Sequence, residues 1–352
     1  GYLSQDIDKI NKLGHKIHEL NQQISKIEAG GIETAMDLRD ERDLALDQLG
    51  ALAKISYKED YKGVVTVKLE DEYFVDELHT YEIGKKTDKL TGFITPYWPQ
   101  LSDTDRDIYV NVFDFNVDIS TALNSDVGEL KALIMSRGDH WADYSDIEGK
   151  GEQEYLDTTN LSVIIDMQAK LDQMVHNMIT AINDQLCPNV TGPVGVTYQD
   201  ANGNTVNLSD AKVLDTENCA RGSDGELPPR ELFVRAGIER YTEVTGSDGK
   251  TYYVYNEEDT SDTSYMYSLT SCGVNEELKK IETLFPHLKQ NGEVDQQLGE
   301  RLEALWNKDL VGLDPTDPDE CNIEEYYQKM IGGLATVGNV YQKKAENLAG
   351  SV

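Results

Sequence analysis

Apolar residues recur at intervals of three or four along the first part of the chain. Between Leu3 and Ile27 they stand at positions 3, 7, 10, 13, 17, 20, 24 and 27. This spacing is typical of the narrow seam along which helices pack as a coiled coil. Gly30 and Gly31 follow, and glycine readily adopts the left-handed conformation that terminates a helix. The pattern therefore predicts a long helix that stops at this glycine pair.

A second helix is predicted directly after the glycines. Thr34 and Asp37 stand three residues apart, as in a capping box. Apolar residues then recur on one face, at Leu38, Ala45, Leu49 and Leu52. The two helices form a helical hairpin in this interpretation. Because a long seam on a single hairpin cannot bury itself, we expect it to pack against another helix.

The far end of the chain carries a matching pattern. Asn322 can cap a helix that has Glu325 at its third position. The apolar residues that follow alternate in the same way, at Ile323, Tyr327, Met330, Leu334, Val337, Tyr341 and Leu348. We expect the first and last helices to lie side by side in a rod closed by the two chain ends. The alternative is two unrelated amphipathic helices, each packed on a globular core.

Between these ends the apolar period changes several times. Residues 63–69 and 107–119 alternate apolar and polar side chains, which predicts strands, the second of them the stronger. Residues 128–137 form a short helical pattern, and 139–157 show no apolar period, which predicts an exposed loop. Residues 164–186 return to the seam spacing and are the expected third helix of the bundle.

Residues 189–271 differ in kind, because turn signals recur between short strand patterns. Asp248-Gly249 between two alternating segments is a strong hairpin signal. Helical patterns return at 272–288 and 294–306, and the acidic, proline-containing residues 313–319 are predicted to be a solvated linker.

These patterns predict an α+β fold with two domains. The first is an elongated discontinuous helical bundle, or rod, formed by residues 1–186 and 272–352, with a small β insertion around 57–127 and the loop at 139–157. The second is a mostly antiparallel β domain at 187–271. The residues expected to hold the rod together share seam positions on its helices: Ile10, Ile17, Leu20, Ile24, Leu49, Met174, Leu334 and Tyr341.

Charge narrows the classes of partner. The 352 residues include 65 acidic and 32 basic side chains, a net charge of −33. Nucleic acid and anionic membrane surfaces both need clustered lysine and arginine, so neither is an expected partner. The four cysteines, Cys187, Cys219, Cys272 and Cys321, fit no zinc spacing. Cys187 and Cys219 could pair as a disulfide, but unpaired core cysteines are the favoured interpretation.

Few residues suggest chemistry. His15 and His18 lie one helical turn apart, but they fall off the seam and lack a third ligand for zinc. Residues 246–251 resemble the tail of a phosphate loop, yet they lie between strands, where a hairpin turn is expected. Residues 103–107 begin like a calcium loop but lack its glycine and final glutamate. We therefore expect no enzyme activity, cofactor or metal site.

Several stretches together resemble the flagellar hook-associated protein 1 family. The first hairpin is the most specific part, with Leu20-Asn-Gln-Gln-Ile24, the glycine pair and Asp37-Leu-Arg-Asp-Glu-Arg-Asp-Leu44. Residues 128–137, 165–183, 292–306 and 326–349 resemble later helices of the family. The likeness covers most of the rod and little of residues 189–271. Residues 139–157 look like an insertion.

The resemblance implies an extracellular structural subunit that joins the hook of the bacterial flagellum to the filament. The implied partners are further copies of itself in a ring, the hook protein, the second junction protein and an export chaperone that binds a terminal segment. Because the chain opens on glycine within a helical pattern, we expect it to be an internal fragment. The alternatives are another axial protein such as flagellin, and a surface adhesin or carbohydrate-binding module that uses the tyrosines at 252–267.

Overall fold

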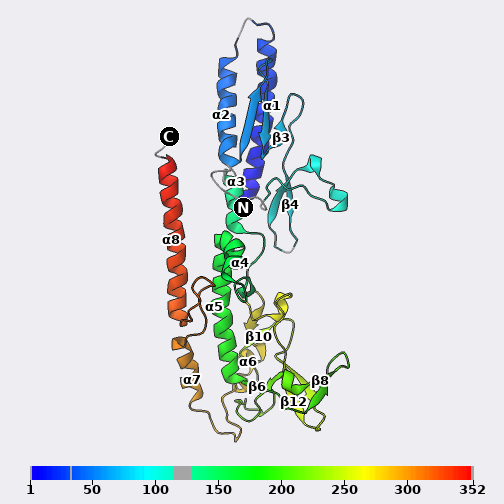
Figure 1. Cartoon of the computed structure of the whole chain (residues 1–352), viewed down its shortest axis with the longest axis vertical. Helices are drawn as coiled ribbons and strands as arrows, with labels where there is room; N and C mark the ends of the chain where they lie inside the picture. The colour runs from blue at the N-terminus through cyan, green and yellow to red at the C-terminus, as the bar shows by residue number, and fades with distance from the viewer. Residues whose placement is uncertain (1, 32–33, 90, 115–127, 350–352) are drawn as a thin grey trace. The chain divides into compact units, whose positions relative to one another are not determined.

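Helices α1 (Tyr2–Glu28) and α2 (Met36–Leu52) form a hairpin in the computed structural model, which describes residues 2–31, 34–89, 91–114 and 128–349. Figure 1 shows the two helices side by side. The predicted end of the first helix is confirmed, since α1 stops just before the glycine pair and Gly31 has a φ of 64°. The predicted capping box is wrong. Ala35 precedes α2 without a side-chain cap.

A small antiparallel sheet packs beside the hairpin. Its order is β1-β2-β3, and the alternating apolar side chains of β2 are buried with those of α1 and α2. The predicted strand at 63–69 and the helix at 128–137 are confirmed as β2 and α3. The elements of this region are β1 (Ile55–Glu59), β2 (Val65–Leu69), β3 (Glu72–Val75), β4 (Gly84–Thr87), β5 (Ile94–Tyr97) and α3 (Glu129–Arg137).

The strand predicted at 107–119 is wrong over its described part. Residues 107–114 make only isolated bridges, to Tyr97 and Asp103, and residues 115–119 lie outside the described residues. The partner segment explains the short pairing. Pro96 has no N–H to donate, so the contact with β5 is limited to the bonds Trp98 N to Val110 O and Val112 N to Pro96 O.

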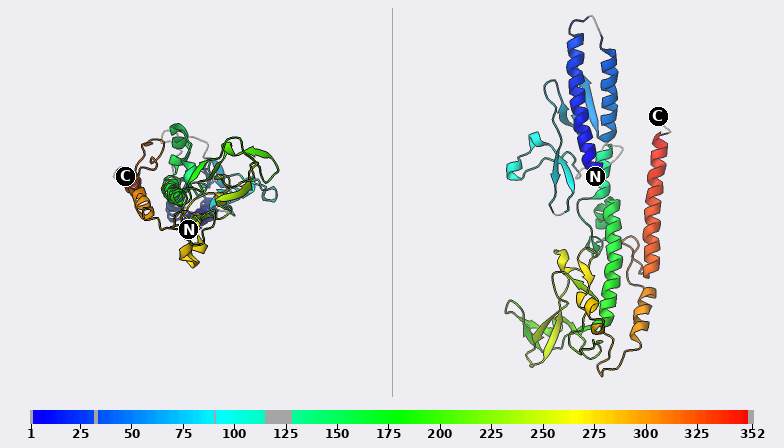
Figure 2. Two further views of the ribbon diagram at one scale, coloured as in Figure 1. Left: turned by 90° about the horizontal axis from the view of Figure 1, so that it is seen from below. Right: turned by 180° about the vertical axis from the view of Figure 1, so that it is seen from behind.

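The second half of the chain is built on α5 (Val163–Leu186), which confirms the long helix predicted there. Helix α8 (Ile323–Ala349) packs beside α5 through its first turns. The β-rich segments lie on the other flank of α5 from α7 (Leu298–Ala304) and α8, as Figures 1 and 2 show. Helix α5 therefore contacts α8 on one face and the β-rich segments on another.

The β-rich part contains a four-stranded sheet in the order β11-β12-β9-β6 and the pairs β7-β8 and β10-β13, all antiparallel. The hairpin predicted at Asp248-Gly249 is confirmed between β11 and β12. The strands are β6 (Asn189–Thr191), β7 (Thr197–Gln199), β8 (Thr205–Asn207), β9 (Lys212–Leu214), β10 (Phe233–Arg235), β11 (Tyr241–Thr245), β12 (Thr251–Tyr255) and β13 (Cys272–Val274).

Three further segments differ from their predictions. Residues 139–157 are not an exposed loop, because Tyr144, Ile147 and Tyr155 are buried. Ile147 and Tyr155 pack in one apolar cluster with side chains of α5. A short helix, α4 (Glu152–Asp157), forms in this segment. Its apolar side chains follow no regular period, so the sequence pattern missed them. Residues 272–288 begin as strand β13 and contain the short helix α6 (Glu276–Lys280) and a single 3₁₀ turn at Glu282–Leu284 in place of a long helix.

The acidic segment at 313–319 is also not a simple solvated linker. Its first two residues, Leu313 and Asp314, are buried. Hydrogen bonds between Asp314 and Asp317 close a tight turn. The turn brings the Asp314 carboxylate to α5, as described below.

The chain divides into two compact units, residues 1–141 and 142–352. This division differs from the discontinuous rod that the sequence predicted. The β-rich residues share a unit with α5 and α8, because polar side chains of α5 bind directly to them. The side-by-side pairing of α1 with α8 stays a prediction.

Candidate functional site

The α1–α2 hairpin buries the seam that the sequence singled out. The side chains of Ile10, Ile17 and Leu49 are fully enclosed in one cluster with the apolar face of β2. Leu20 and Ile24 are buried in a second cluster nearer the hairpin turn. These positions recur on one face of their helices, which is why the sequence pattern could locate them.

The remaining seam positions differ from one another. Met174 on α5 packs against a buried cluster that includes Tyr326 and Met330. Leu334 is 40% exposed, which differs from the burial expected for a rod position. The side chain of Tyr341 lies outside the described residues. Helix α8 is thus packed through its first turns and exposes apolar side chains at Tyr327, Ile331, Leu334 and Val340.

A buried polar lock joins the hairpin to the sheet. Asn21 of α1 donates to the carbonyl of Val65 over 2.7 Å and accepts from its N–H over 3.0 Å. Arg42 of α2 donates to Asn21 Oδ1, to the carbonyl of Gly63 and to Glu59. Asn21 and Arg42 are almost fully enclosed. Because buried polar groups are costly without partners, this set fixes the position of α1, α2 and β2 relative to one another.

A second polar cluster closes the hairpin turn. Arg39 makes a two-pronged contact with the Glu28 carboxylate, at 2.8 and 2.7 Å, and a third bond to Glu59. The N–H of Ala35 also donates to Glu28. These hydrogen bonds, the one from Arg39 first, lower the pKa of Glu28 to about 2. Glu28 thus connects the end of α1 to Ala35, the residue that precedes α2.

Helix α5 presents a polar stripe to the β-rich segments. Asp172 accepts hydrogen bonds from Ser268 and from the N–H groups of Leu269 and Tyr144. About three helical turns further along α5, Asn183 forms hydrogen bonds with the backbone of Phe233. This spacing places the polar residues on one face of the helix, where they add to the apolar contacts that Ile165, Ala169 and Leu186 make. Both kinds of contact dock residues 142–161 and 231–269 on α5.

The stripe ends at a buried charged group. Glu231 accepts hydrogen bonds from Tyr267 and Asn183 and lies 3.7 Å from the guanidinium of Arg240. Burial raises the pKa of Glu231 to about 7, although the Tyr267 hydrogen bond and the nearby arginines act against it. Arg240 also donates a hydrogen bond to Asp184 of α5. The group connects α5 to β11 and to the segment before β13.

On the opposite side of α5, Lys170 lies between two carboxylates. Its Nζ is 2.8 Å from Asp166 Oδ2 and 2.9 Å from Asp314 Oδ2. The Tyr155 hydroxyl donates to both carboxylates. Burial favours a raised pKa for Asp314, but hydrogen bonds from Thr316 and Lys170 outweigh it and hold this pKa below its ordinary value. The cluster joins α4, α5 and the turn before α8.

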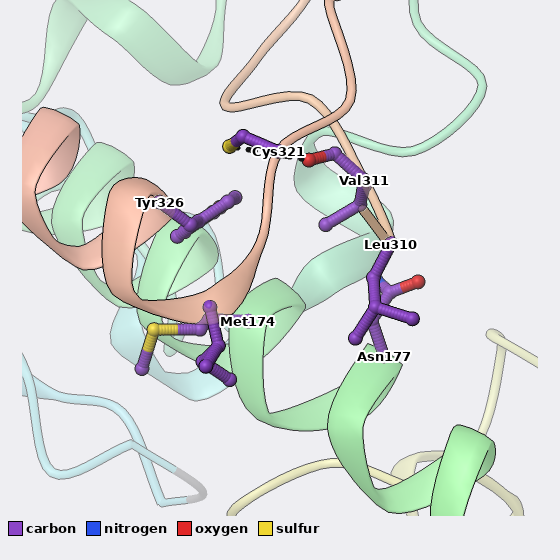
Figure 3. Close-up of a pocket in the computed structure, with 7 residues that line it drawn as sticks. Met174, Asn177, Leu310, Val311, Cys321 and Tyr326 are labelled. Atoms are coloured by element: carbon purple, nitrogen blue, oxygen red, sulfur yellow. Dashed lines mark hydrogen bonds between the residues drawn. The ribbon is translucent and has the colours of Figure 1, made fainter. Parts of the chain in front are cut away.

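A shallow pocket lies between α5 and the start of α8. Figure 3 shows Met174, Asn177 and Tyr326 around it, with the Cys321 thiol directed at the carbonyl of Val311. Its volume is about 10 Å³, room for roughly one water molecule. The lining is mostly apolar. A pocket of this size suits helix packing better than the binding of a small molecule, which takes several hundred Å³.

The other candidate residues behave as surface groups. His15 pairs with Glu82 and His18 bonds to the carbonyl of Asp76. Residues 103–107 form a short turn capped by Asp103. Among the residues that the structure describes, no three His, Cys, Asp or Glu side chains converge as a metal ion requires. Within the same residues, no helix is apolar over enough of its length to cross a membrane.

The four cysteines are unpaired, as the favoured interpretation of the sequence held. Cys187, Cys219 and Cys321 are buried. Burial raises the pKa of all four thiols. Because the thiolate is the reactive form, a raised pKa lowers the reactivity of these thiols at neutral pH.

Comparison with known families decides the relationship. A family model described as "Flagellar hook-associated protein FlgK helical domain" matches residues 1–197, more than half of the chain. The chain belongs to the FlgK family. FlgK-family proteins are structural components of the bacterial flagellum that assemble with other flagellar proteins. The resemblance noted in the sequence is thereby confirmed.

A solved structure is also similar to the chain. It is described as "The structure of the flagellar hook junction protein FlgK from Burkholderia pseudomallei", with 14% identity and a TM-score of 0.38. The match covers 82% of this chain and 50% of that one, so the chain spans about half the length of this relative. At that score, membership of the FlgK family rests on the family model. A search of curated proteins finds no match.

The FlgK-type motifs contain residues whose role the sequence analysis missed. Asn21 lies in the first motif, Leu20-Asn-Gln-Gln-Ile24, and Arg39 and Arg42 lie in the second. The two motifs therefore supply residues of the Asn21–Arg42 lock and of the Glu28–Arg39 cluster. A polar residue at a seam-facing helix position was the available signal, because burial of such a residue requires a partner.

Proposed function

We propose that this chain is part of an axial subunit that joins hook to filament at the hook–filament junction, outside the cell. The observation that carries the proposal is the family match over residues 1–197. The similar structure from Burkholderia pseudomallei is that of a flagellar hook junction protein, which agrees with this position. The proposed partners are further copies in a ring, the hook protein, the second junction protein and an export chaperone bound by a terminal segment.

The proposed work of the subunit is mechanical. A junction subunit must keep its surfaces in fixed positions while neighbours of two kinds pack on it. The buried locks at Asn21–Arg42 and Asp172 hold helices and strands in one arrangement within each unit. Such hydrogen-bonded buried polar groups favour one packing over alternatives. Rigidity of this kind suits an adaptor.

The rod also remains part of the proposal. We place α1 beside α8, with Leu334 and Tyr341 facing the hairpin and Met174 continuing the seam. The exposed apolar side chains of Tyr327, Ile331 and Leu334 support this, since their spacing of four and three residues places them on one face of α8.

The β-rich tyrosines favour packing over glycan binding. Tyr255 packs edge-on against Tyr241 at a ring distance of 6.1 Å, and Tyr267 is completely buried. Tyr252 packs with the core of the four-stranded sheet. A carbohydrate-binding module would need such rings exposed side by side.

Deletion of the gene in the source bacterium tests the proposal. We expect cells with hooks but no filaments, and flagellin released into the medium, because filament subunits have no junction to build on. Restoring the full-length gene is the control and must restore filaments. Normal filaments on the deletion strain would contradict the junction role.

A further inference from the structure

Lys170 occupies an unusual position for a lysine, because it is buried between two carboxylates that come from different parts of the chain. Its Nζ lies 2.9 Å from Asp314 Oδ2 and 2.8 Å from Asp166 Oδ2. The side chains of Lys170 and Asp314 are only 10% and 5% exposed. Two tyrosines lie beside them: the Lys170 Nζ is 5.7 Å from the centre of the Tyr155 ring, and the Tyr326 hydroxyl donates to the carbonyl of Lys170.

This arrangement brings together the parts of a condensation reaction. A lysine amine is a nucleophile towards carbonyl carbon once it has lost a proton. Asp314 supplies the carboxyl group, held in place by two hydrogen bonds from Thr316 to its other oxygen, at 2.8 and 2.6 Å. Asp166 is a second carboxylate within reach of the same amine. Fixing the two reactants in contact raises their effective concentration greatly, to as much as about 10⁵–10⁸ M in favourable cases.

We propose that Lys170 and Asp314 condense into an intramolecular isopeptide bond, with Asp166 as the proton carrier. The Lys170 ammonium gives one proton, by way of Asp166, to Oδ2 of Asp314, and the resulting amine attacks Cγ of the neutral Asp314 carboxyl group. The Nζ–Cγ bond forms and the Cγ–Oδ2 bond breaks. Oδ2 leaves as water with this proton and a second proton that Asp166 carries from Nζ. An ammonium and a carboxylate thus become an amide and one water molecule, and Asp166 is regenerated.

Tyr155 positions the reacting groups. Its hydroxyl donates 2.5 Å to Asp166 and 3.2 Å to Asp314, and burial, with Asp166 next in effect, raises the pKa of Tyr155, which keeps the hydroxyl protonated. The two Thr316 donors at Asp314 Oδ1, the oxygen that stays in the amide, stabilise the negative charge that develops there during attack. The enclosed site excludes the water that would favour the reverse reaction.

The bond would connect α5 covalently to the turn that leads into α8. All of the chain from 171 to 313 would lie in the closed loop, including the β-rich segments. A pull on α8 would then be carried by covalent bonds to α5 rather than by packing alone. The reaction needs no cofactor, oxidant or partner chain, so it does not depend on the junction role.

Intact mass spectrometry of the denatured full chain tests the proposal. We expect a mass lower than that of the sequence by one water molecule, and a tryptic digest in which cleavage after Lys170 is blocked and its peptide is joined to the peptide that contains Asp314. A chain with the full sequence mass would overturn the proposal. A water loss that maps to another site, such as an aspartate–glycine pair, would overturn it as well.

Three variants make the assignment specific. Lys170→Arg keeps the positive charge and must retain the full mass of its sequence; loss of water from it would refute the lysine assignment. Asp314→Asn must lose ammonia in place of water, because the leaving group is then an amide nitrogen. Asp166→Asn keeps the shape of the proton carrier without its basicity. Complete condensation in Asp166→Asn would remove the role given to Asp166.

Discussion

At the residue scale, enclosed side chains of two kinds hold the first unit together. Apolar seam residues such as Ile17 and Leu49 exclude water from the hairpin. Polar residues such as Asn21 and Arg42 satisfy backbone groups of the sheet that would otherwise be buried without partners. The first kind supplies free energy through burial, and the second selects one arrangement.

Leu20→Ala tests the apolar part. Leu20 is 5% exposed, so removal of its side chain leaves a cavity, and we expect a loss of about 2–5 kcal/mol in the free energy of unfolding. Leu78→Ala is the matched control, because this leucine is 74% exposed and its loss should change stability by less than about 0.5 kcal/mol. Urea unfolding measures both. An unchanged midpoint for Leu20→Ala would contradict the seam assignment.

Glu28→Gln tests the cluster at the hairpin turn. The folded-state pKa of about 2 lies below the ordinary 4.5, so the ionised carboxylate stabilises the fold above pH 4.5 and this contribution is lost as the pH falls towards 2. We expect the variant to be less stable at pH 7 and to lose less stability between pH 5 and 2. Urea midpoints across this range decide it. Glu19→Gln, on the exposed face of α1, should follow the unmodified chain.

Some of these residues could be predicted from the sequence, and others could not. Ile10, Ile17, Leu20, Ile24 and Leu49 follow the helical period, which local sequence records. The partners of Asn21 and Lys170 lie 44 and 144 residues away in the chain. Only the tertiary fold brings such partners together, so the local sequence pattern could not predict these polar contacts.

At the scale of elements, long periodic helices were predictable and short irregular segments were not. Helices α1, α2, α5 and α8 carry sustained apolar spacing, and each was expected. The segment at 139–157 packs through scattered tyrosines, and 107–114 alternates like a strand but meets a proline-containing neighbour. Tertiary context overrides local pattern in both cases.

Two helix glycines give a test at this scale. A Cβ on Gly14 would lie 2.6 Å from the ring of Phe74, so α1 approaches β3 closely at this point. We expect Gly14→Ala to lower stability by about 1–3 kcal/mol through overpacking. Gly50 in α2 has its nearest neighbour, Ile55, at 3.7 Å. Gly50→Ala should be neutral or stabilising by up to about 1 kcal/mol. Equal effects in thermal unfolding would contradict the close packing.

At the scale of the whole molecule, two compact units carry a net charge of −33. Free subunits therefore repel one another, and salt should favour their assembly by screening this charge. The proposed rod requires α1 and α8 to meet although their own units are held together by different contacts. The prediction that they lie side by side comes from the matching apolar spacing of the two helices.

Pulsed electron paramagnetic resonance, which measures the distance between two spin labels, tests the rod. Spin labels at Gln22→Cys in α1 and Ala335→Cys in α8 occupy exposed positions, with the partly exposed Cys272 replaced by serine. We expect one short, narrow distance if the two helices lie side by side. A long or broad distribution would contradict the rod and leave α8 to another partner.

The most direct test of the account is the place of the protein on the flagellum. Immunogold electron microscopy with an antibody against residues 142–352, applied to intact flagella of the source bacterium, locates it. The account predicts gold particles only at the boundary between hook and filament. Label along the filament, or scattered over the cell surface, would contradict it.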